Sequence, residues 1–293
     1  MRVLFVAAWL VLAAQSAQAG LEFVIETRSF EFTTPRIERS TILAEGISLK
    51  MESKDAQTGA PDTMIYRGDT RQMMVVDHQQ RSYMIIDKQF ADQMVGQLQQ
   101  MAGQMKGLLD SVPPEQRALI DQMTKNQPQQ NGQLARPQVG VRSTGQQAQV
   151  YGYPCQLFVV TSDRRKVRDV WVTNWNNIKG SRNLETTFSS MSDFTSELLS
   201  AFPVQAQNQA PMHDNAFATI SKMGGFPVAS REYRPDGSIE SESALRSATY
   251  RQISQQEFQQ PAGYQQDSPL GGLSSGMGGG TASGGMFGQG RRQ

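Results

Sequence analysis

The sequence predicts an α+β chain with a mainly antiparallel sheet, and three observations lead to this prediction. Short runs rich in β-branched and aromatic residues are separated by turn residues, as in strands. Two longer segments repeat apolar residues every three or four positions, as in amphipathic helices. These segments alternate in blocks of strands, helix, strands, helix and strands, an order typical of α+β folds.

The N-terminal half contains five predicted strands. Turn residues Gly68-Asp69 and His78-Gln79-Gln80 separate the last three, which is the spacing of an antiparallel meander. The predicted strands cover residues 21–32, 40–51, 64–66, 73–76 and 83–86.

An amphipathic helix is predicted after the meander, because six apolar residues fall on one face over about five turns. A second short helix is predicted over 115–123, with Pro114 near its first turn. The residues of the first stripe are Phe90, Met94, Leu98, Met101, Met105 and Leu108.

The C-terminal half is predicted to form two hairpins with a helix between them. The first hairpin joins 156–161 to 166–173, and the second joins 226–233 to 239–253. Pro235 and Gly237 mark the second turn, since proline presets φ and glycine accepts a positive φ. The helix between them carries Leu184, Phe188, Met191, Phe194, Leu198 and Phe202 on one face.

The first 19 residues have the pattern of a secretory signal peptide. Met1-Arg2 is basic, residues 3–14 are apolar, and Ala17-Gln18-Ala19 places small residues where a signal peptidase reads. We therefore expect cleavage after Ala19 and a periplasmic or secreted protein. The chain from residue 20 has 27 basic and 27 acidic residues, because only Arg2 is lost, and this balance argues against nucleic-acid binding. No later apolar run is long enough to span a membrane.

Two segments have low-complexity composition. Residues 265–293 are predicted to be a disordered tail, because 10 glycines fall within 271–293 and little apolar surface is present. Residues 127–149 are predicted to be a loop, because 8 of the 23 are glutamine and no strand or helix period is present. The predicted folded unit is a single domain over 20–264.

Several short motifs resemble a bacterial family known as domain of unknown function 4412. Its members are similar to the periplasmic lipoprotein-carrier fold, a curved, open-barrel antiparallel sheet with amphipathic helices across its concave face. The resemblance implies that fold and compartment and no catalytic residues. The matching motifs are Ile65-Tyr66-Arg67-Gly68-Asp69, the 73–83 hairpin, Gly152-Tyr153-Pro154-Cys155, 170–175, Gly225-Phe226-Pro227-Val228 and 258–264.

Catalysis and cofactor binding have little support in the sequence. No Gly-x-Ser-x-Gly motif is present, and His78 and His213 lie in polar turns or loops. We therefore predict a protein that is not an enzyme and has no cofactor or metal site. The alternative is a soft metal such as copper bound by methionine, with His78; the candidates are Met73, Met74, Met84, Met94, Met101 and Met105.

Cys155 is the single cysteine of the chain, so a disulfide within the chain is excluded. Two roles are therefore open for Cys155: a small hydrophobic residue buried in the core, or a partner in an intermolecular disulfide in an oxidising compartment.

The predicted function is binding. If the helical stripe faces an incompletely filled concave sheet, its residues and Trp171 line an apolar cavity for a lipid or a hydrophobic peptide. If that space is filled, the stripe is core, and the protein is a structural module that interacts with a protein partner. The candidate lining residues are Phe90, Met94, Leu98, Met101, Met105, Leu108 and Trp171.

Overall fold

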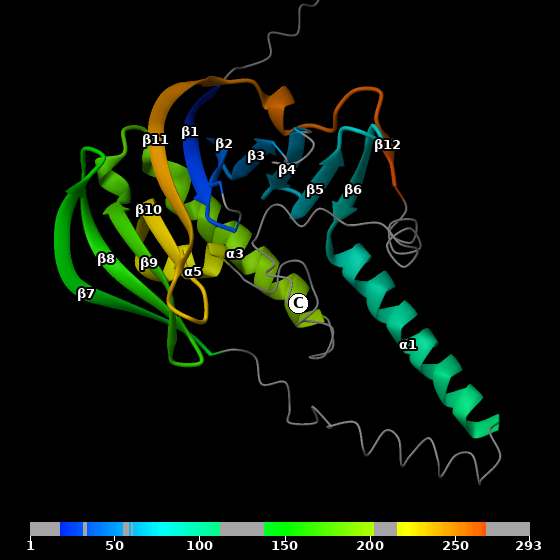
Figure 1. Cartoon of the computed structure of the whole chain (residues 1–293). Coiled ribbons are helices and arrows are strands. Elements are labelled where there is room, and N and C mark those ends of the chain that lie inside the picture. The colour runs from blue at the N-terminus through cyan, green and yellow to red at the C-terminus, as the bar shows by residue number, and fades with distance from the viewer. Residues whose placement is uncertain are drawn as a thin grey trace, which may run out of the picture.

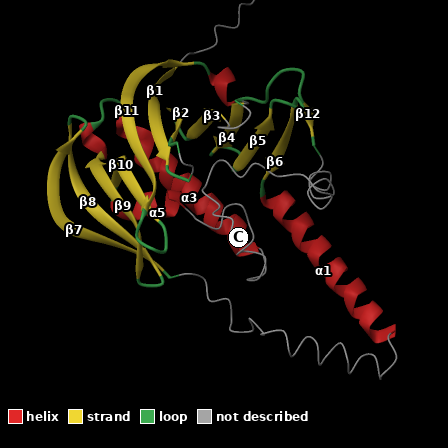
Figure 2. Cartoon of the chain, in the orientation of Figure 1, coloured by secondary structure: helices red, strands yellow, loops and turns green. Residues whose placement is uncertain are grey.

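One sheet of twelve strands organises the fold (Figures 1 and 2). The computed structural model describes residues 18–31, 34–54, 59, 61–111, 138–201 and 216–267. The strand order is β12-β6-β5-β4-β3-β2-β1-β11-β10-β9-β8-β7. The strands are β1 (Gln18–Ser29), β2 (Arg36–Glu45), β3 (Ser48–Lys54), β4 (Pro61–Arg67), β5 (Gln72–Asp77), β6 (Ser82–Ile86), β7 (Val139–Val150), β8 (Tyr153–Ser162), β9 (Arg165–Asn174), β10 (Gly225–Tyr233), β11 (Ile239–Ile253) and β12 (Gln265–Gln266).

Every pair of neighbouring strands is antiparallel except β12 and β6, which are parallel. The two halves of the chain form one sheet because β1 pairs with β11 along its whole length. The sheet is open and strongly curved (Figure 1). The predicted α+β class, with a mainly antiparallel sheet, is confirmed.

The described residues form three α-helices: α1 (Lys88–Ser111), α3 (Leu184–Ala201) and α5 (Ala216–Met223). Helix α3 lies within the curve of the sheet, and α5 packs along α3 and contacts β7 and β10 (Figure 1). The predicted amphipathic helices on the concave face are therefore present. No described helix is both long enough and apolar enough to cross a membrane.

The helix predicted from the Phe90 stripe forms as α1, but α3 covers the concave face in its place. Helix α1 contacts β6 and α3, and Figure 1 shows it running away from the sheet. Phe90 and Ala91, near its N-terminus, belong to the main core or pack against it. Periodicity showed that both segments are helical, but it does not specify which helix a curved sheet encloses.

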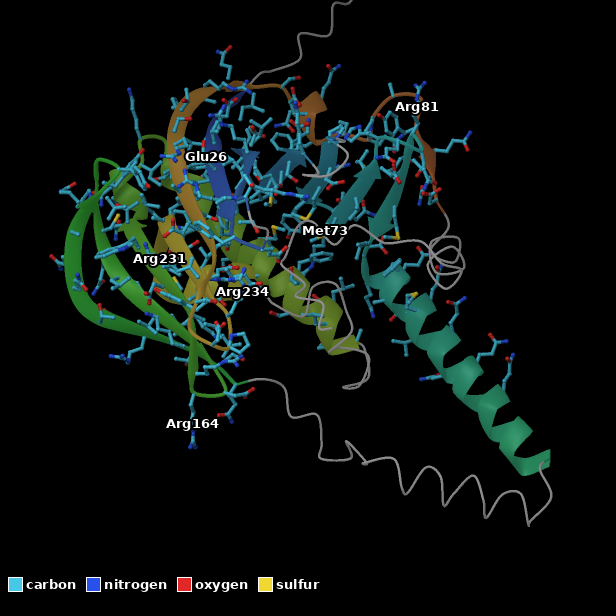
Figure 3. All side chains as sticks on the ribbon, viewed as in Figure 1. Glu26, Met73, Arg81, Arg164, Arg231 and Arg234 are labelled. Carbon is cyan, nitrogen blue, oxygen red and sulfur yellow. The ribbon has the colours of Figure 1, made fainter. Side chains whose placement is uncertain are left out.

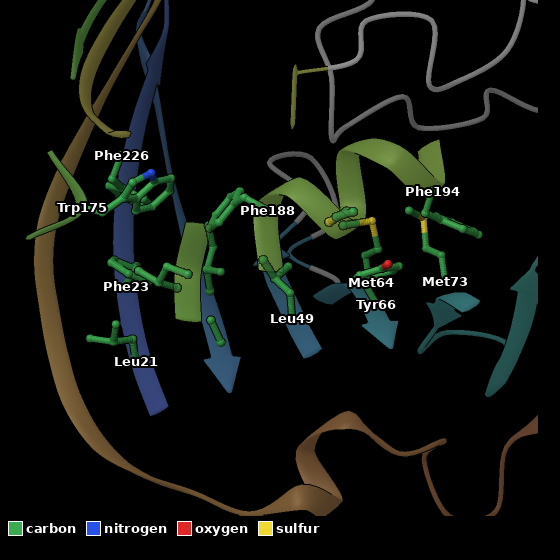
Figure 4. Close-up of a cluster of buried hydrophobic side chains, with 14 of the residues drawn as sticks. Leu21, Phe23, Leu49, Met64, Tyr66, Met73, Trp175, Phe188, Phe194 and Phe226 are labelled. Carbon is green, nitrogen blue, oxygen red and sulfur yellow. The ribbon is translucent and has the colours of Figure 1, made fainter. Parts of the chain in front are cut away.

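The main core fills the space between α3 and the sheet (Figure 4). Leu49 and Met191 are fully buried there. Trp175 and Phe188 lie with ring centroids 5.5 Å apart, and Tyr66 and Phe194 are also 5.5 Å apart. Close packing of this kind leaves little room for a ligand beneath α3.

A second apolar cluster lies on the opposite face of β2–β6, where the C-terminal segment crosses the sheet. We call residues 254–267 the strap; they include the short 3-10 helix η3 (Gln255–Phe258) and β12. Phe258 is 1% exposed and packs with Ile65 and Met74. The adjacent Met73 belongs instead to the main core, as alternation along a strand requires.

Ion pairs line one face of β1, and Figure 3 labels Glu26, which takes part in two of them. Glu26 pairs with Arg246 at 2.7 Å and with Arg39 at 3.4 Å, and Glu22 pairs with Arg251 at 2.6 Å. The hydrogen bond from Arg246 lowers the pKa of the Glu26 carboxyl below its ordinary value. These residues alternate with the buried Leu21 and Phe23, so β1 has one charged face and one core face.

Three boundaries differ from the sequence prediction. The strand predicted over 40–51 is two strands, β2 and β3, because a turn at Gly46, where φ is 57°, divides it. Residues 139–149 were assigned to a loop but form most of β7, because the backbone ladder with β8 holds a strand whose side chains are nearly all exposed. The folded unit was predicted to end at residue 264, but β12 continues it to Asp267, whose N–H donates to the Tyr83 carbonyl at 2.8 Å. A largely exposed polar strand has no apolar alternation by which its sequence would reveal it. The predicted helix over 115–123 lies outside the described residues.

Candidate functional site

A hollow of about 550 Å³ opens beside the β7–β8 hairpin and the C-terminal end of α5. A second pocket, under the strap, has only about 70 Å³. The larger one is called the hollow below. Its lining residues are Gln147, Ala148, Gln149, Pro154, Cys155, Gln156, Phe158, Val172, Asn174, Asn177, Met223 and Gly224.

The strand register places several of these side chains on one face of the sheet. Gln147 lies opposite Gln156 on β8, and Gln156 lies opposite Val172 on β9. Residues directly opposite each other share a face, and residues two apart along a strand also share it. Gln149 and Phe158 therefore lie on the same face as Gln147, Gln156 and Val172. This face of the sheet lines the hollow with glutamines and, at one end, with apolar residues.

Hydrogen bonds hold part of the wall in place. The Thr173 hydroxyl donates to the Pro154 carbonyl at 2.8 Å and accepts from the Asn177 amide at 3.0 Å. The Gln156 amide donates to the Ser143 hydroxyl at 2.7 Å. These bonds fix the orientation of two carboxamides that line the hollow.

The hollow contains carboxamides and no ionisable group other than Cys155. Gln147, Gln149, Gln156, Asn174 and Asn177 supply both donors and acceptors. Such a lining suits a neutral polar ligand, because a charged group would find no opposite charge among the lining residues.

Cys155 is 4% exposed and has no disulfide partner. Burial raises the pKa of its thiol above the ordinary value. The thiol is therefore protonated at neutral pH, and its first predicted alternative, a small buried hydrophobe, describes its place in the fold.

The predicted ligand-lining residues lie elsewhere. Phe90 and Trp171 are partly buried against the main core, and Met94 is half-buried on α1. Leu98, Met101, Met105 and Leu108 lie on α1, and their side chains are outside the described part. None of these seven residues lines the hollow. Sequence reasoning missed the hollow because its glutamines lie in a segment interpreted as a loop; the signal was the pair of glutamines at 147 and 149, followed by a Tyr-Gly turn.

His78 occupies a structural position under the strap. Its Nε2 lies 2.8 Å from the Thr63 hydroxyl, and its Nδ1 lies 2.9 Å from the Tyr264 hydroxyl. Both ring nitrogens are therefore occupied in joining the strap to β4. His213 lies outside the described residues.

These features define a class: an α+β protein whose twelve-stranded open antiparallel sheet curves around one amphipathic helix. Residues 114–264, more than half of the chain, match the family described as Domain of unknown function (DUF4412). The protein belongs to this family.

Several solved structures are similar to this chain at very low sequence identity. An uncharacterized conserved protein from Thermus thermophilus is 6% identical, with 86% of this chain and 90% of that chain covered and a TM-score of 0.41. MucB, in the Pseudomonas aeruginosa MucA/MucB complex, is 10% identical, with 85% and 58% covered and a TM-score of 0.33. A LolA superfamily protein from Nitrosomonas europaea is 7% identical, with 84% and 92% covered and a TM-score of 0.28. No curated protein sequence matches the chain.

Proposed function

We propose that this protein is an exported, non-catalytic binding module that recognises a neutral polar segment of a partner protein. The observation that carries the proposal is the contrast between two spaces. The space beneath α3 is filled by side chains, whereas the hollow of about 550 Å³ beside β7 is lined by carboxamides.

The size and chemistry of the hollow support a polypeptide ligand. Its volume lies within the roughly 300–1,000 Å³ common for ligand sites. Carboxamides pair well with peptide groups and with Asn, Gln, Ser and Thr side chains, because each one donates and accepts hydrogen bonds. Phe158, Val172 and Met223 add an apolar contact surface at one end.

A lipid ligand receives less support from this geometry. An acyl chain needs an elongated apolar cavity, and the residues that would line one under α3 pack against each other (Figure 4). The protein-interaction alternative is therefore favoured over the carrier alternative. The remaining support for a lipid or hydrophobic peptide is the apolar stripe of α1, where Phe90 and Met94 are half-buried.

A non-catalytic role is supported by the state of the candidate reactive groups. His78 is engaged at both ring nitrogens. The raised pKa of Cys155 disfavours the thiolate that a nucleophile requires. Export is supported by the signal-like sequence of residues 1–19; N-terminal sequencing of the exported protein should give Gly20 as its first residue.

Fluorescence polarisation with two sets of labelled nine-residue peptides tests the proposed ligand class. One set is rich in Ser, Thr, Asn and Gln, and the other is rich in Leu and Phe. We expect saturable binding of the polar set, and Gln156→Glu should weaken it at least about tenfold, roughly 1.4 kcal/mol. Gln252→Glu, at an exposed glutamine of β11 outside the hollow, is the matched control and should leave binding unchanged.

Two results would contradict the proposal. One is binding of the apolar set alone. The other is phospholipid retained by the protein in native mass spectra and released by Leu98→Asp, which would identify the α1 stripe as the ligand site.

A further inference from the structure

The two edge regions of the sheet differ in how their strands are covered. At one edge the strap covers β6, where β12 pairs with residues Ser82 and Tyr83. At the other edge, among the described residues, β7 pairs with β8 alone (Figure 1). An edge strand leaves a row of backbone N–H and C=O groups without partners and is a template for another strand.

The β7 edge carries few of the features that usually prevent pairing, namely one bulge and one charged residue. It is 12 residues long and contains neither proline nor lysine. Arg142 is its single charged residue, and residues 142–149 are all exposed. One bulge, between Ser143 and Gln147, interrupts the ladder with β8. The stretch from Gln147 to Val150 on the far side of this bulge is regular and uncharged.

The hairpin turn determines which backbone groups point outward. Tyr151 and Gly152 have φ values of 48° and 84°, as in a type I′ turn, so the flanking pair Val150–Tyr153 is hydrogen-bonded. Hydrogen-bonded and non-hydrogen-bonded pairs alternate along an antiparallel ladder. Ala148–Cys155 is therefore hydrogen-bonded, and Gln149–Pro154 is not, in agreement with the missing N–H of proline.

It follows that the N–H and C=O of Ala148 point toward β8, while those of Gln147 and Gln149 point toward the free edge. An antiparallel partner strand centred opposite Ala148 would satisfy these outward groups on both sides of the centre. In that register the central pair is of the non-hydrogen-bonded kind, with Cα atoms about 4.5 Å apart.

We propose that this edge binds the same edge of a second copy of the chain, with a two-fold axis at Ala148. Gln147 of one copy then lies opposite Gln149 of the other, and the small alanines meet at the axis. Opposed glutamines can form amide ladders across strands. Arg142 pairs with Val159 and Ala148 with Cys155, four residues apart on β8. The two Arg142 residues therefore lie roughly 26 Å apart at about 3.3 Å per residue, which is beyond the screening length.

The self-complementary order Gln147-Ala148-Gln149 is what favours a second copy over a strand of different sequence. Because the glutamines of this pair also line the hollow, the axis places the two hollows side by side on one face of a continuous sheet. This association does not depend on the ligand proposed for the hollow, and each can fail alone.

Cysteine cross-linking tests the register, since Cys155 is the single native cysteine. Cys155→Ala removes the thiol opposite position 148. In that background, Ala148→Cys places two thiols across the axis, within the roughly 4.4–6.8 Å between Cα atoms that a disulfide requires. Ser143→Cys is the matched control, because Ser143 lies opposite Phe158, three residues from Cys155 on β8, which puts its two copies roughly 20 Å apart. We expect mild oxidation to give a disulfide-linked dimer with the first variant, at least about tenfold faster than with the second; equal rates, or no dimer from either, would overturn the proposal.

Sedimentation velocity gives an independent readout without added thiols. The protein should sediment as a dimer, and Ala148→Lys should convert it to a monomer, because two ammonium groups meet at the axis. Ser143→Lys should remain dimeric, and equal far-UV circular dichroism should show that both variants fold. A monomer at every concentration, or a dimer that Ala148→Lys leaves intact, contradicts pairing between two copies through β7. If the protein is a monomer, the β7 edge is available to pair with a strand of another protein.

Discussion

The rings of Phe23 and Phe226 stack with their centroids 4.5 Å apart and their planes inclined by 18°. Phe23 lies on β1 and Phe226 on β10, and β11 separates these two strands in the sheet. The contact therefore spans β11 and joins a strand from the N-terminal part of the chain to one from the C-terminal part. Trp175 and Phe188 meet the Phe226 ring edge-on, at 6.0 and 6.1 Å.

Phe226→Ala should lower the free energy of unfolding by about 3–5 kcal/mol, because it leaves a cavity among the three remaining aromatic rings, those of Phe23, Trp175 and Phe188. Urea denaturation followed by tryptophan fluorescence measures the change. Ile37→Ala, at a side chain that is 57% exposed, is the control and should cost less than about 1 kcal/mol. A similar loss in both variants would show that the aromatic cluster is not the stabilising centre.

Met191→Lys should unfold the domain or destabilise it by roughly 3 kcal/mol or more, since the fully buried Met191 lies on the face of α3 that packs on the sheet. Ser189→Lys, on the exposed face of the same helix, should be nearly neutral. Thermal melts monitored by circular dichroism compare them. If both variants melt like the parent protein, α3 does not cover the sheet.

Truncation separates the strap from the residues that follow it. Ending the chain after Ile253 should lower Tm by about 5–10 °C, because it uncovers the second apolar cluster and removes Phe258. Ending it after Asp267 should change Tm by less than about 2 °C, because the removed sequence is rich in glycine and poor in apolar residues. Equal effects of the two truncations would contradict this role of the strap.

Glu240→Gln should stabilise the protein at neutral pH. Burial, with the nearby Glu232 carboxylate, raises the pKa of Glu240. A pKa that is raised in the folded state means that folding favours the protonated carboxyl. Glu240 therefore contributes to the stability of the folded protein below its unfolded-state pKa, and this contribution is lost as the pH rises through its folded-state pKa. Because the group is partly exposed, the gain at pH 7 should be only about 1–2 °C in Tm.

The control for this prediction is the pH profile itself. The difference in Tm between Glu240→Gln and the parent protein should vanish below about pH 4, where both side chains are neutral. A gain that persists unchanged at that pH would show that packing, rather than charge, causes it.

Much of the fold was predictable because local patterns specify it. Runs of β-branched and aromatic residues indicated β1, β4–β6 and β8–β11, and one predicted strand over 40–51 where the structure has β2 and β3. The 3.6-residue periods indicated α1 and α3. The turn around Pro235 and Gly237 was identified because the chemistry of these residues allows few alternatives. In each case the signal lies within about a dozen neighbouring residues.

The candidate site was not predictable, because its residues come together only through long-range pairing. Gln147 on β7, Val172 on β9 and Met223 on α5 carry no shared local pattern, and Gln147 sits in a glutamine-rich segment that resembles a loop. Likewise, the two apolar stripes of α1 and α3 are equivalent by periodicity, and only their packing distinguishes them.

The sequence by itself determined most of the strands, two of the three described helices, the α+β class and the family resemblance, because apolar period and turn chemistry act over short distances. The tertiary structure decided three further matters: that α3 rather than α1 fills the curve, that the hollow is lined by amides, and that β7 ends the sheet with its edge open. Each depends on which distant segments pair, and no local pattern of the sequence specifies that pairing.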